Sequence, residues 1–389
     1  MKIGILTFHK AINYGAFLQS FALSNELTNR FPEHNVEIVD YIAPMEKKKI
    51  VINVLWGIKH YGLINGVREL QKISSFNRIY KKLNLSKKKR FKNLQELHEY
   101  IDNNYDVLII GSDAVFNWNQ NGYPSAFVPK YNFKQCKVLS YAASVHGLRY
   151  LNEPLERLEE CGQVFSKMKL VGVRDMNTEK FVKRCYTEAN ISHCCDPTVV
   201  INVDKVKQYA KNYMNRVYSK YKCDLSKKFI VLMLPDSDFT RKIKEHYSGK
   251  FQIITLFKPS KDAQYYLYDL NPFEWTMVLS NASVVITSYF HGTLLALRQG
   301  TPVISIDLSN YNDKDYEGKL KDLLQKRLNL PEFYVNGDDM NNDEFQKKLI
   351  SIINSAIQGH YSERIRIGMK CEGAAFEKFC NTFSAIIKE

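Results

Sequence analysis

Short runs of β-branched and aliphatic residues alternate with longer helical patterns along the chain. This alternation constrains the fold most, because it is typical of a parallel sheet covered by helices. Helical patterns such as Ala16–Leu27 and Pro154–Lys167 lie between the runs. We therefore predict an α/β protein with strands at Lys2–Phe8, Asn35–Asp40, Val107–Ile110, Val138–Ala142, Leu170–Arg174, Phe229–Leu234, Gln252–Leu256, Val284–Thr287 and Val303–Ile306.

The strand pattern stops and restarts near the middle of the chain, after a polar stretch rich in Lys and Tyr. A length of 389 residues fits two domains. We predict an N-terminal Rossmann-like domain over 1–200 with a basic helical insertion at 45–104, a connector over 201–226, and a C-terminal Rossmann-like domain over 227–389 that ends in helices. Because ligands of open parallel sheets bind at the carboxyl ends of strands, we expect the two domains to face each other across a cleft that holds the active site.

The chain is basic, with a formal net charge of +14 and lysine clusters at 47–49, 81–82, 87–89 and 227–228. A field of this sign attracts nucleic acid, an anionic membrane or a phosphorylated substrate. A solvated basic surface with no partner is the alternative. No nucleic-acid-binding motif accompanies the charge, so we expect no nucleic-acid partner.

Signals for export, membrane spanning and metal binding are not found in the sequence. No apolar run approaches the ~18 residues that a transmembrane helix needs, and no signal-peptide pattern stands at Met1. The eight Cys include no Cys-x-x-Cys pair. We therefore expect a cytoplasmic protein with reduced thiols and no metal site.

Polar residues follow several predicted strands. Asn13, Tyr14 and Gly15 follow the first, where a glycine lets the backbone approach a ligand or simply makes a turn. Ser112 and Asp113 follow the strand Val107–Ile110, and Asp113 is either a functional carboxylate or a helix cap. Ser144 follows Val138–Ala142, where it lines a ligand site or only packs.

The strongest candidate is the segment after Val284–Thr287. Ser288, Tyr289, His291, Gly292 and Thr293 combine hydroxyls, a histidine and a glycine at a helix start, where backbone N–H groups bind anions and the histidine can exchange protons.

Arg174 ends another predicted strand and can offer a bidentate fork to a carboxylate or phosphate, or pair with Asp175. No Walker loop, dinucleotide fingerprint or nucleophile elbow is present.

At these residues the chain resembles the polysaccharide pyruvyltransferase family, over roughly residues 3 to 307. The matching segments, in order, are Thr7-Phe8-His9 with Asn13-Tyr14-Gly15-Ala16, Gly111-Ser112-Asp113 with Phe116-Asn117, Ser140-Tyr141-Ala142-Ala143-Ser144, Val173-Arg174-Asp175, Asp196-Pro197-Thr198, Ser288-Tyr289-Phe290-His291-Gly292 and Gly300-Thr301-Pro302-Val303-Ile304. One departure is Tyr289, which stands where the family often has Arg.

The resemblance implies a glycosyltransferase B-like fold and the transfer of pyruvate from phosphoenolpyruvate to two hydroxyls of a sugar, which forms a cyclic ketal. The implied acceptor is a bacterial cell-surface polysaccharide or its lipid-diphosphate-linked precursor, and no cofactor is needed besides the donor substrate. The C-terminal domain would then be the donor side and the N-terminal domain the acceptor side.

Residue roles follow from this resemblance. His291 would be the catalytic acid and Asp113 would deprotonate or orient the acceptor. The donor would be bound by Arg174, Ser288, Tyr289, Gly292 and Thr293, and the acceptor by Asn13, Tyr14, Gly15, Ser112 and Ser144.

Two alternatives are a nucleotide-sugar glycosyltransferase of the same fold and a non-catalytic docking protein of a glycan-assembly complex. The insertion suits peripheral docking on the anionic inner face of a membrane through its lysines and the aromatic residues Trp56, Tyr61, Phe76, Tyr80 and Phe91.

Overall fold

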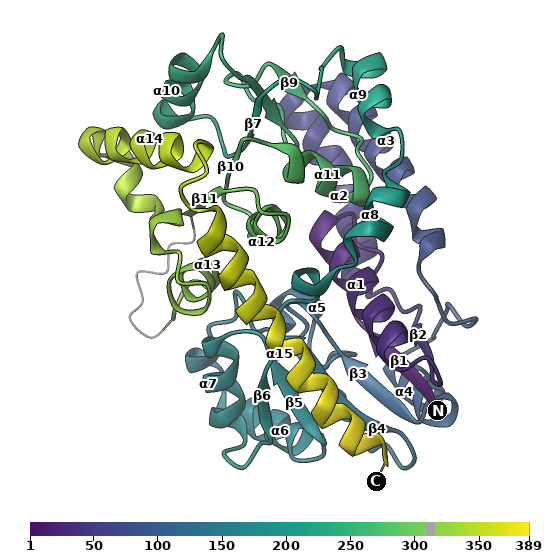
Figure 1. Cartoon of the computed structure of the whole chain (residues 1–389). Coiled ribbons are helices and arrows are strands. Elements are labelled where there is room, and N and C mark those ends of the chain that lie inside the picture. Colours follow the sequence, from purple (N-terminus) through teal and green to yellow (C-terminus); the bar gives the residue numbers. More distant parts are fainter. Residues whose placement is uncertain (309–315, 389) are drawn as a thin grey trace. The chain divides into compact units, whose positions relative to one another are not determined.

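A computed structural model describes residues 1–308 and 316–388 and, within these ranges, forms two six-stranded parallel sheets with helices between the strands (Figure 1). The chain divides into two compact units. The first unit comprises Met1–Gly62, Asn77–Asn202 and Gly373–Glu389, and the second comprises Leu63–Phe76 and Val203–Glu372. The predicted α/β architecture with two parallel sheets is confirmed.

The sheet of the first unit has the strand order β2-β1-β3-β4-β5-β6. Its strands are β1 (Lys2–Leu6), β2 (Asn35–Ile38), β3 (Val107–Ile110), β4 (Lys137–Ala143), β5 (Leu170–Val173) and β6 (Ile191–His193). The helices are α1 (Tyr14–Arg30), α2 (Pro44–Tyr61), α4 (Leu94–Asn104), α5 (Trp118–Asn121), α6 (Leu155–Phe165) and α7 (Met176–Cys185). All four residues of β3 are buried, which a parallel strand covered on both faces requires.

The sheet of the second unit has the order β12-β11-β10-β7-β8-β9. Its strands are β7 (Phe229–Met233), β8 (Gln252–Thr255), β9 (Tyr265–Tyr266), β10 (Val284–Thr287), β11 (Val303–Asp307) and β12 (Tyr334–Asn336). The helices include α8 (Val203–Tyr209), α9 (Tyr213–Tyr221), α10 (Asp238–Tyr247), α11 (Pro272–Asn281), α12 (Phe290–Arg298), α13 (Lys319–Lys321) and α14 (Asp343–Ile357).

Two helices cross between the units along the chain. Most of α3 (Leu63–Ile79) belongs to the second unit, although the residues before and after it belong to the first. The last helix, α15 (Ser362–Lys388), begins in the second unit and ends in the first. The chain therefore starts and finishes in the same unit.

The unit boundaries differ from the expected ranges in three places, and one of them is the end of the last helix: Gly373–Glu389, expected in the C-terminal domain, belongs to the first unit. The segment 201–226, expected as a connector, contains α8 and α9, and from Val203 onward it belongs to the second unit. Val206 and Val217 of these helices are fully buried, and Arg216 bonds Glu274 and Asp269 of the same unit. The segment 45–104 contains α2, α3 and α4 and is shared between the units.

Candidate functional site

The loops after β1 and β3 meet where the strand order of the first sheet changes direction. Ligands of open parallel sheets bind at the carboxyl ends of the strands flanking such a point. Gln19 of α1 joins the two loops: its Nε2 donates to Thr7 Oγ1 (2.8 Å), and its Oε1 accepts from the backbone N (3.2 Å) and Oγ (2.6 Å) of Ser112. Ser112 is fully buried, so its hydrogen bonds to Gln19 hold the loop after β3 in place from the protein interior.

The start of α1 lies at the same end of the sheet. The Asn13 side chain caps this helix by accepting a hydrogen bond from Ala16 N (3.2 Å). Tyr14 and Gly15 are buried, whereas Asn13 is exposed. Of these three residues predicted to bind the acceptor, Asn13 is the one that solvent reaches.

The backbone at Gly111 and Asp113 is tightly constrained. Gly111 has φ +130°, and a Cβ there would lie 2.1 Å from the carbonyl oxygen of Tyr141. Asp113 has φ +77°, which a non-glycine residue seldom adopts. Its carbonyl accepts the backbone N–H of Ser144 (2.9 Å), so the loop after β3 is joined to the end of β4.

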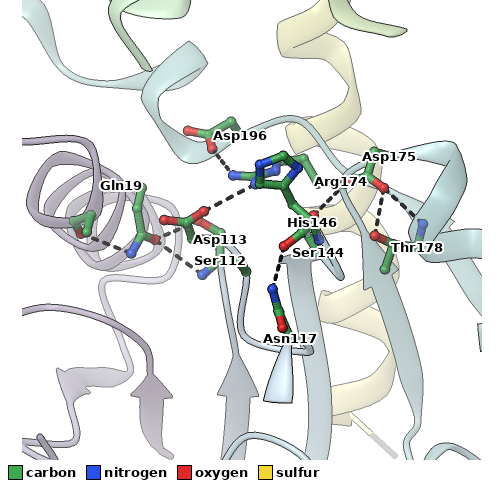
Figure 2. A network of polar contacts seen from close by, with 12 residues as sticks. Gln19, Ser112, Asp113, Asn117, Ser144, His146, Arg174, Asp175, Thr178 and Asp196 are labelled. Carbon is green, nitrogen blue, oxygen red and sulfur yellow. Dashed lines mark hydrogen bonds and ion pairs between the residues drawn. The ribbon is translucent and has the colours of Figure 1, made fainter. Parts of the chain in front are cut away.

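Arg174 forms a buried ion-pair network with two carboxylates (Figure 2). Its Nη1 lies 2.9 Å from Asp196 Oδ2 and its Nη2 lies 3.2 Å from Asp113 Oδ1. The Arg174 side chain is 2% exposed, and Asp113 is the accessible member of the trio, at 20%. Burial opposes the charge of Arg174, but the nearby carboxylates of Asp113, Asp196 and Asp175 outweigh it and raise the pKa of the guanidinium.

The network decides between the alternatives left open for these residues. Asn117, not Asp113, caps the helix that follows. Asp175 does not pair with Arg174 through a hydrogen bond but caps α7 by accepting from Thr178 N (2.9 Å).

Ser144 has its hydroxyl in a second set of hydrogen bonds (Figure 2). Its Oγ donates to Asp175 Oδ2 (2.6 Å) and accepts from the backbone N of His146 (3.1 Å). Asn117 Nδ2 donates to the carbonyl of His146 (2.6 Å). Ser144 is fully buried, so it shapes the loop that carries the half-buried His146.

A further buried cluster follows β1 and β2. His9 Nε2 lies 3.0 Å from Asp40 Oδ1, and Lys10 Nζ lies 2.7 Å from both Asp40 oxygens. Burial of Asp40 disfavours its charge, but the hydrogen bonds from His9 and Lys10 prevail and lower the pKa of the carboxyl. The pairing fixes the ends of two adjacent strands.

The strand order of the second sheet changes direction between β7 and β10. The predicted residues Ser288, Tyr289, His291, Gly292 and Thr293 follow β10 at this point. The helix α12 begins at Phe290, whereas the sequence pattern predicted a helix over Leu294–Gln299, so His291, half-buried, lies in the first turn. The first turn of α12 holds no acidic residue, which keeps the positive end of the helix available to an anion.

Close packing fixes this helix start. A Cβ at Gly292 would lie 2.8 Å from Met233 Cε at the end of β7. Thr293 Oγ1 is hydrogen-bonded to Ser305 Oγ of β11 (2.6 Å), and Tyr289 N donates to Thr287 Oγ1 (3.0 Å). The Tyr289 ring stacks on Phe257, which follows β8, with 4.1 Å between ring centroids.

The structure groups the predicted residues by unit. Arg174, predicted to bind the donor, lies with Asp113 in the first unit, whereas Ser288, Tyr289, His291, Gly292 and Thr293 lie in the second. The sequence suggested no role for Gln19 or Asp196, and it suggested Asp175 only as a pairing partner of Arg174. Asp175 and Asp196 lie in segments that match the family, and this match could have identified them as site residues.

In the described ranges, no group of three or more His, Cys, Asp or Glu side chains is arranged to hold a metal ion. No helix among those residues is sufficiently long and apolar to cross a membrane.

Solved structures similar to this chain define the class of fold. One is a glycosyltransferase from Rickettsia africae, with 10% identity, a TM-score of 0.56, and coverage of 100% of this chain and 99% of that one. Another is a UDP-GlcNAc 2-epimerase from Neisseria meningitidis, also with 10% identity and a TM-score of 0.56, covering 99% and 100%. With the two parallel sheets, these likenesses give the chain a glycosyltransferase B-like fold.

The family follows from the sequence. The chain belongs to the polysaccharide pyruvyl transferase family, whose model matches residues 13–310. No curated protein matches the chain significantly. Membership makes this protein a transferase of polysaccharide biosynthesis, and it confirms the family resemblance.

Proposed function

We propose that this protein transfers pyruvate from phosphoenolpyruvate to two hydroxyls of one sugar, forming a cyclic ketal and releasing inorganic phosphate. The acceptor is a cell-surface polysaccharide or its lipid-diphosphate-linked precursor. The observation that carries the donor assignment is His291 in the first turn of α12, beside the positive end of the helix and at the direction change of the second sheet. An anion site and a proton donor together are what phosphoenolpyruvate requires.

His291 is the proposed acid. The enol phosphate of phosphoenolpyruvate becomes electrophilic at C2 when its methylene carbon receives a proton. A sugar hydroxyl then forms a bond to C2 and loses its proton to a base. The bond from C2 to the phosphate oxygen breaks, phosphate leaves, and the second hydroxyl closes the ketal as its proton leaves with phosphate or solvent. Backbone N–H groups at the start of α12 stabilise the departing charge.

Asp113 is the proposed base for the acceptor hydroxyl, because it is the accessible carboxylate of the network. Both Nη groups of Arg174 bond carboxylates, so we assign Arg174 the role of holding Asp113 in position. Asn13 is exposed and is proposed to contact the acceptor. Ser112 and Ser144 are buried and shape the loops, so we propose that they position these contacts.

The test is phosphate release from phosphoenolpyruvate by the purified full chain with a panel of lipid-linked disaccharides. The proposal predicts release only when donor and a suitable acceptor are both present. Transfer from a nucleotide sugar instead would favour the glycosyltransferase alternative. Binding of acceptors without turnover of either donor would favour the non-catalytic docking protein.

We further propose that α2 and α3 dock on an anionic membrane that carries the acceptor. Taken singly, each helix has four large apolar residues on one face, with exposed fractions from 41 to 75%. In α2 these are Val51, Ile52, Leu55 and Trp56, and in α3 they are Leu63, Ile64, Val67 and Leu70. This spacing and the neighbouring lysines suit an interfacial helix.

Some residues expected at the membrane do not support this role. Phe76 and Tyr80 are buried, so their predicted contact with lipid is wrong. Lys88 is paired with Glu96 at 2.9 Å. The side chains of Lys47 and Tyr61 lie outside the described residues.

Co-sedimentation with phosphatidylglycerol vesicles tests the docking. Replacing Leu55 by Ser should weaken binding about ten- to a hundredfold, since a buried Leu side chain contributes about 1.5–3 kcal/mol and each 1.4 kcal/mol is a factor of about ten. The control is Leu155→Ser, which removes another exposed leucine of the same unit from α6. Binding should fall with salt, because the Debye length shortens. Equal vesicle binding by the two variants would contradict the proposed docking. So would a wild-type protein that does not bind anionic vesicles at low salt.

A further inference from the structure

A nearly buried lysine lies beside the proposed donor site of the second unit. Lys72 of α3 is 8% exposed, and its Nζ lies 5.1 Å from the centroid of the Phe257 ring. The same ring stacks on Tyr289, the residue that precedes the first turn of α12. Lys72 is thereby connected by one aromatic ring to the segment that carries His291.

The surroundings of Lys72 do not favour its charge. Burial lowers the pKa of its ammonium; nearby Glu69 opposes this shift, and the positive charge of Lys258 adds to it. The carboxylate of Glu69 therefore does not compensate for burial and a second cation together. Buried ionisable groups whose charged form is disfavoured are typical of functional sites, where a bound ligand of opposite charge stabilises the charged form.

The position of these residues in the sheet points to a ligand as well. Phe257 and Lys258 follow β8, and Tyr289 follows β10, and both strands flank β7. The carboxyl ends of these strands border the direction change between β7 and β10, where ligands of such sheets bind. A cation on α3 is thus brought to the expected binding edge by a segment remote in sequence.

We propose that Lys72, with Lys258 beside it, binds an anionic group of the donor next to the Phe257–Tyr289 stack. This inference rests on the proposed function for the identity of the donor, and it adds a binding residue that lies outside the segments matching the family motifs. Under it, the donor's phosphate or carboxylate forms a charge-assisted hydrogen bond to the Lys72 ammonium.

A packing role and a ligand-binding role for Lys72 predict opposite changes in the melting temperature of the protein without ligand. If the lysine served only to pack on Phe257, its replacement by Met should lower the melting temperature. If it serves a ligand, the replacement removes a disfavoured buried charge, and the melting temperature should stay equal or rise.

The experiment measures binding of phosphoenolpyruvate and of inorganic phosphate by calorimetry, and melting temperatures with and without each anion. The variants are Lys72→Met, Lys72→Arg, Lys258→Met and, as control, Arg68→Met. Arg68 lies one turn from Lys72 on α3 and contacts the rings of Tyr266 and Tyr268, so the control removes a similar cation–π contact and the same charge.

We expect Lys72→Met to weaken phosphoenolpyruvate binding about tenfold or more and to abolish the melting shift that the anion produces. Lys72→Arg should retain most of the affinity, and Lys258→Met, at an exposed position, should lose about threefold. Arg68→Met should bind like the wild type. If Lys72→Met does not fold, the other two variants decide. The assignment would be overturned if Lys258→Met kept the wild-type affinity for phosphoenolpyruvate while Lys72→Arg lost it.

The remaining outcomes separate this inference from the proposed function. Lys72→Met with wild-type affinity overturns the lysine's role even if the enzyme turns over phosphoenolpyruvate. Anion binding that depends on Lys72, without phosphate release from phosphoenolpyruvate for any acceptor, supports the site and overturns pyruvyl transfer. A wild-type protein that binds neither anion overturns both.

Discussion

At the scale of single residues, His291 is the side chain on which the proposed chemistry most depends. Replacing it by Gln removes the acid while keeping an uncharged polar group. Loss of a general acid typically reduces the rate by about 10²–10⁴-fold, and we expect this loss in kcat for phosphate release with an unchanged melting temperature. The control is His360→Gln, which alters an exposed histidine of the same unit. Near-normal turnover by the folded His291 variant would remove the acid assignment.

The sequence predicted the location of most candidate residues but not their partners. Asp113 and Arg174 were identified because each lies at or just after the end of a predicted strand, and strand ends are where open parallel sheets bind ligands. Their ion pair depends on which strands are neighbours, and nothing in the local sequence encodes that order. Gln19 was missed for the same reason, since its role appears only once β1 and β3 lie side by side. Lys72 was not singled out, because it lies within the predicted insertion 45–104 but outside its lysine clusters.

At the scale of elements, the turn after β3 is a tightly constrained connection of the first unit. Gly111→Ala places a Cβ against the backbone carbonyl of Tyr141, which cannot move without breaking the sheet. Gly122 has φ +79° but no atom within 4 Å of an added Cβ, so Gly122→Ala isolates the backbone strain alone.

Denaturation of the two variants should therefore differ. We expect Gly122→Ala to cost about 1–2 kcal/mol of unfolding free energy and Gly111→Ala at least about 3 kcal/mol. Equal costs would show that the loop relaxes around the new methyl group.

Element boundaries were predicted best where strands are fully buried. Val107–Ile110 and Val284–Thr287 agree residue by residue, because parallel strands covered on both faces are continuous apolar runs. The short strands β6, β9 and β12 were missed. Each has two or three residues, and none of the three is fully buried, so their sequences carry little pattern.

At the scale of the whole molecule, the first unit requires the end of the chain. Phe379 of α15 is fully buried and contacts Tyr141 of β4, with 4.6 Å between ring centroids. Phe379→Ala should reduce the unfolding free energy by about 3–5 kcal/mol, as for other large-to-small core changes. Hydrogen exchange should show the loss of protection in β3 and β4 of the first unit. A loss confined to the second unit would contradict the division of the chain described above.

The sequence pattern was sufficient for two parallel α/β units because alternation of strands and helices is local. It did not reveal that α3 joins the second unit or that the end of α15 joins the first. Which unit a helix joins depends on the packing of side chains that are far apart along the chain, such as Tyr141 with Phe379 and Arg68 with Tyr268.

Ketal formation from phosphoenolpyruvate can be checked on the reaction product itself. The full chain is incubated in D₂O with phosphoenolpyruvate labelled with ¹³C at C2 and an acceptor that supports phosphate release, and the product is analysed by NMR. We predict a labelled carbon bonded to two sugar oxygens, with a methyl group that carries one deuterium from the acid. Free pyruvate as the only labelled product, or a labelled enol ether with one sugar oxygen and an intact methylene, would contradict ketal transfer.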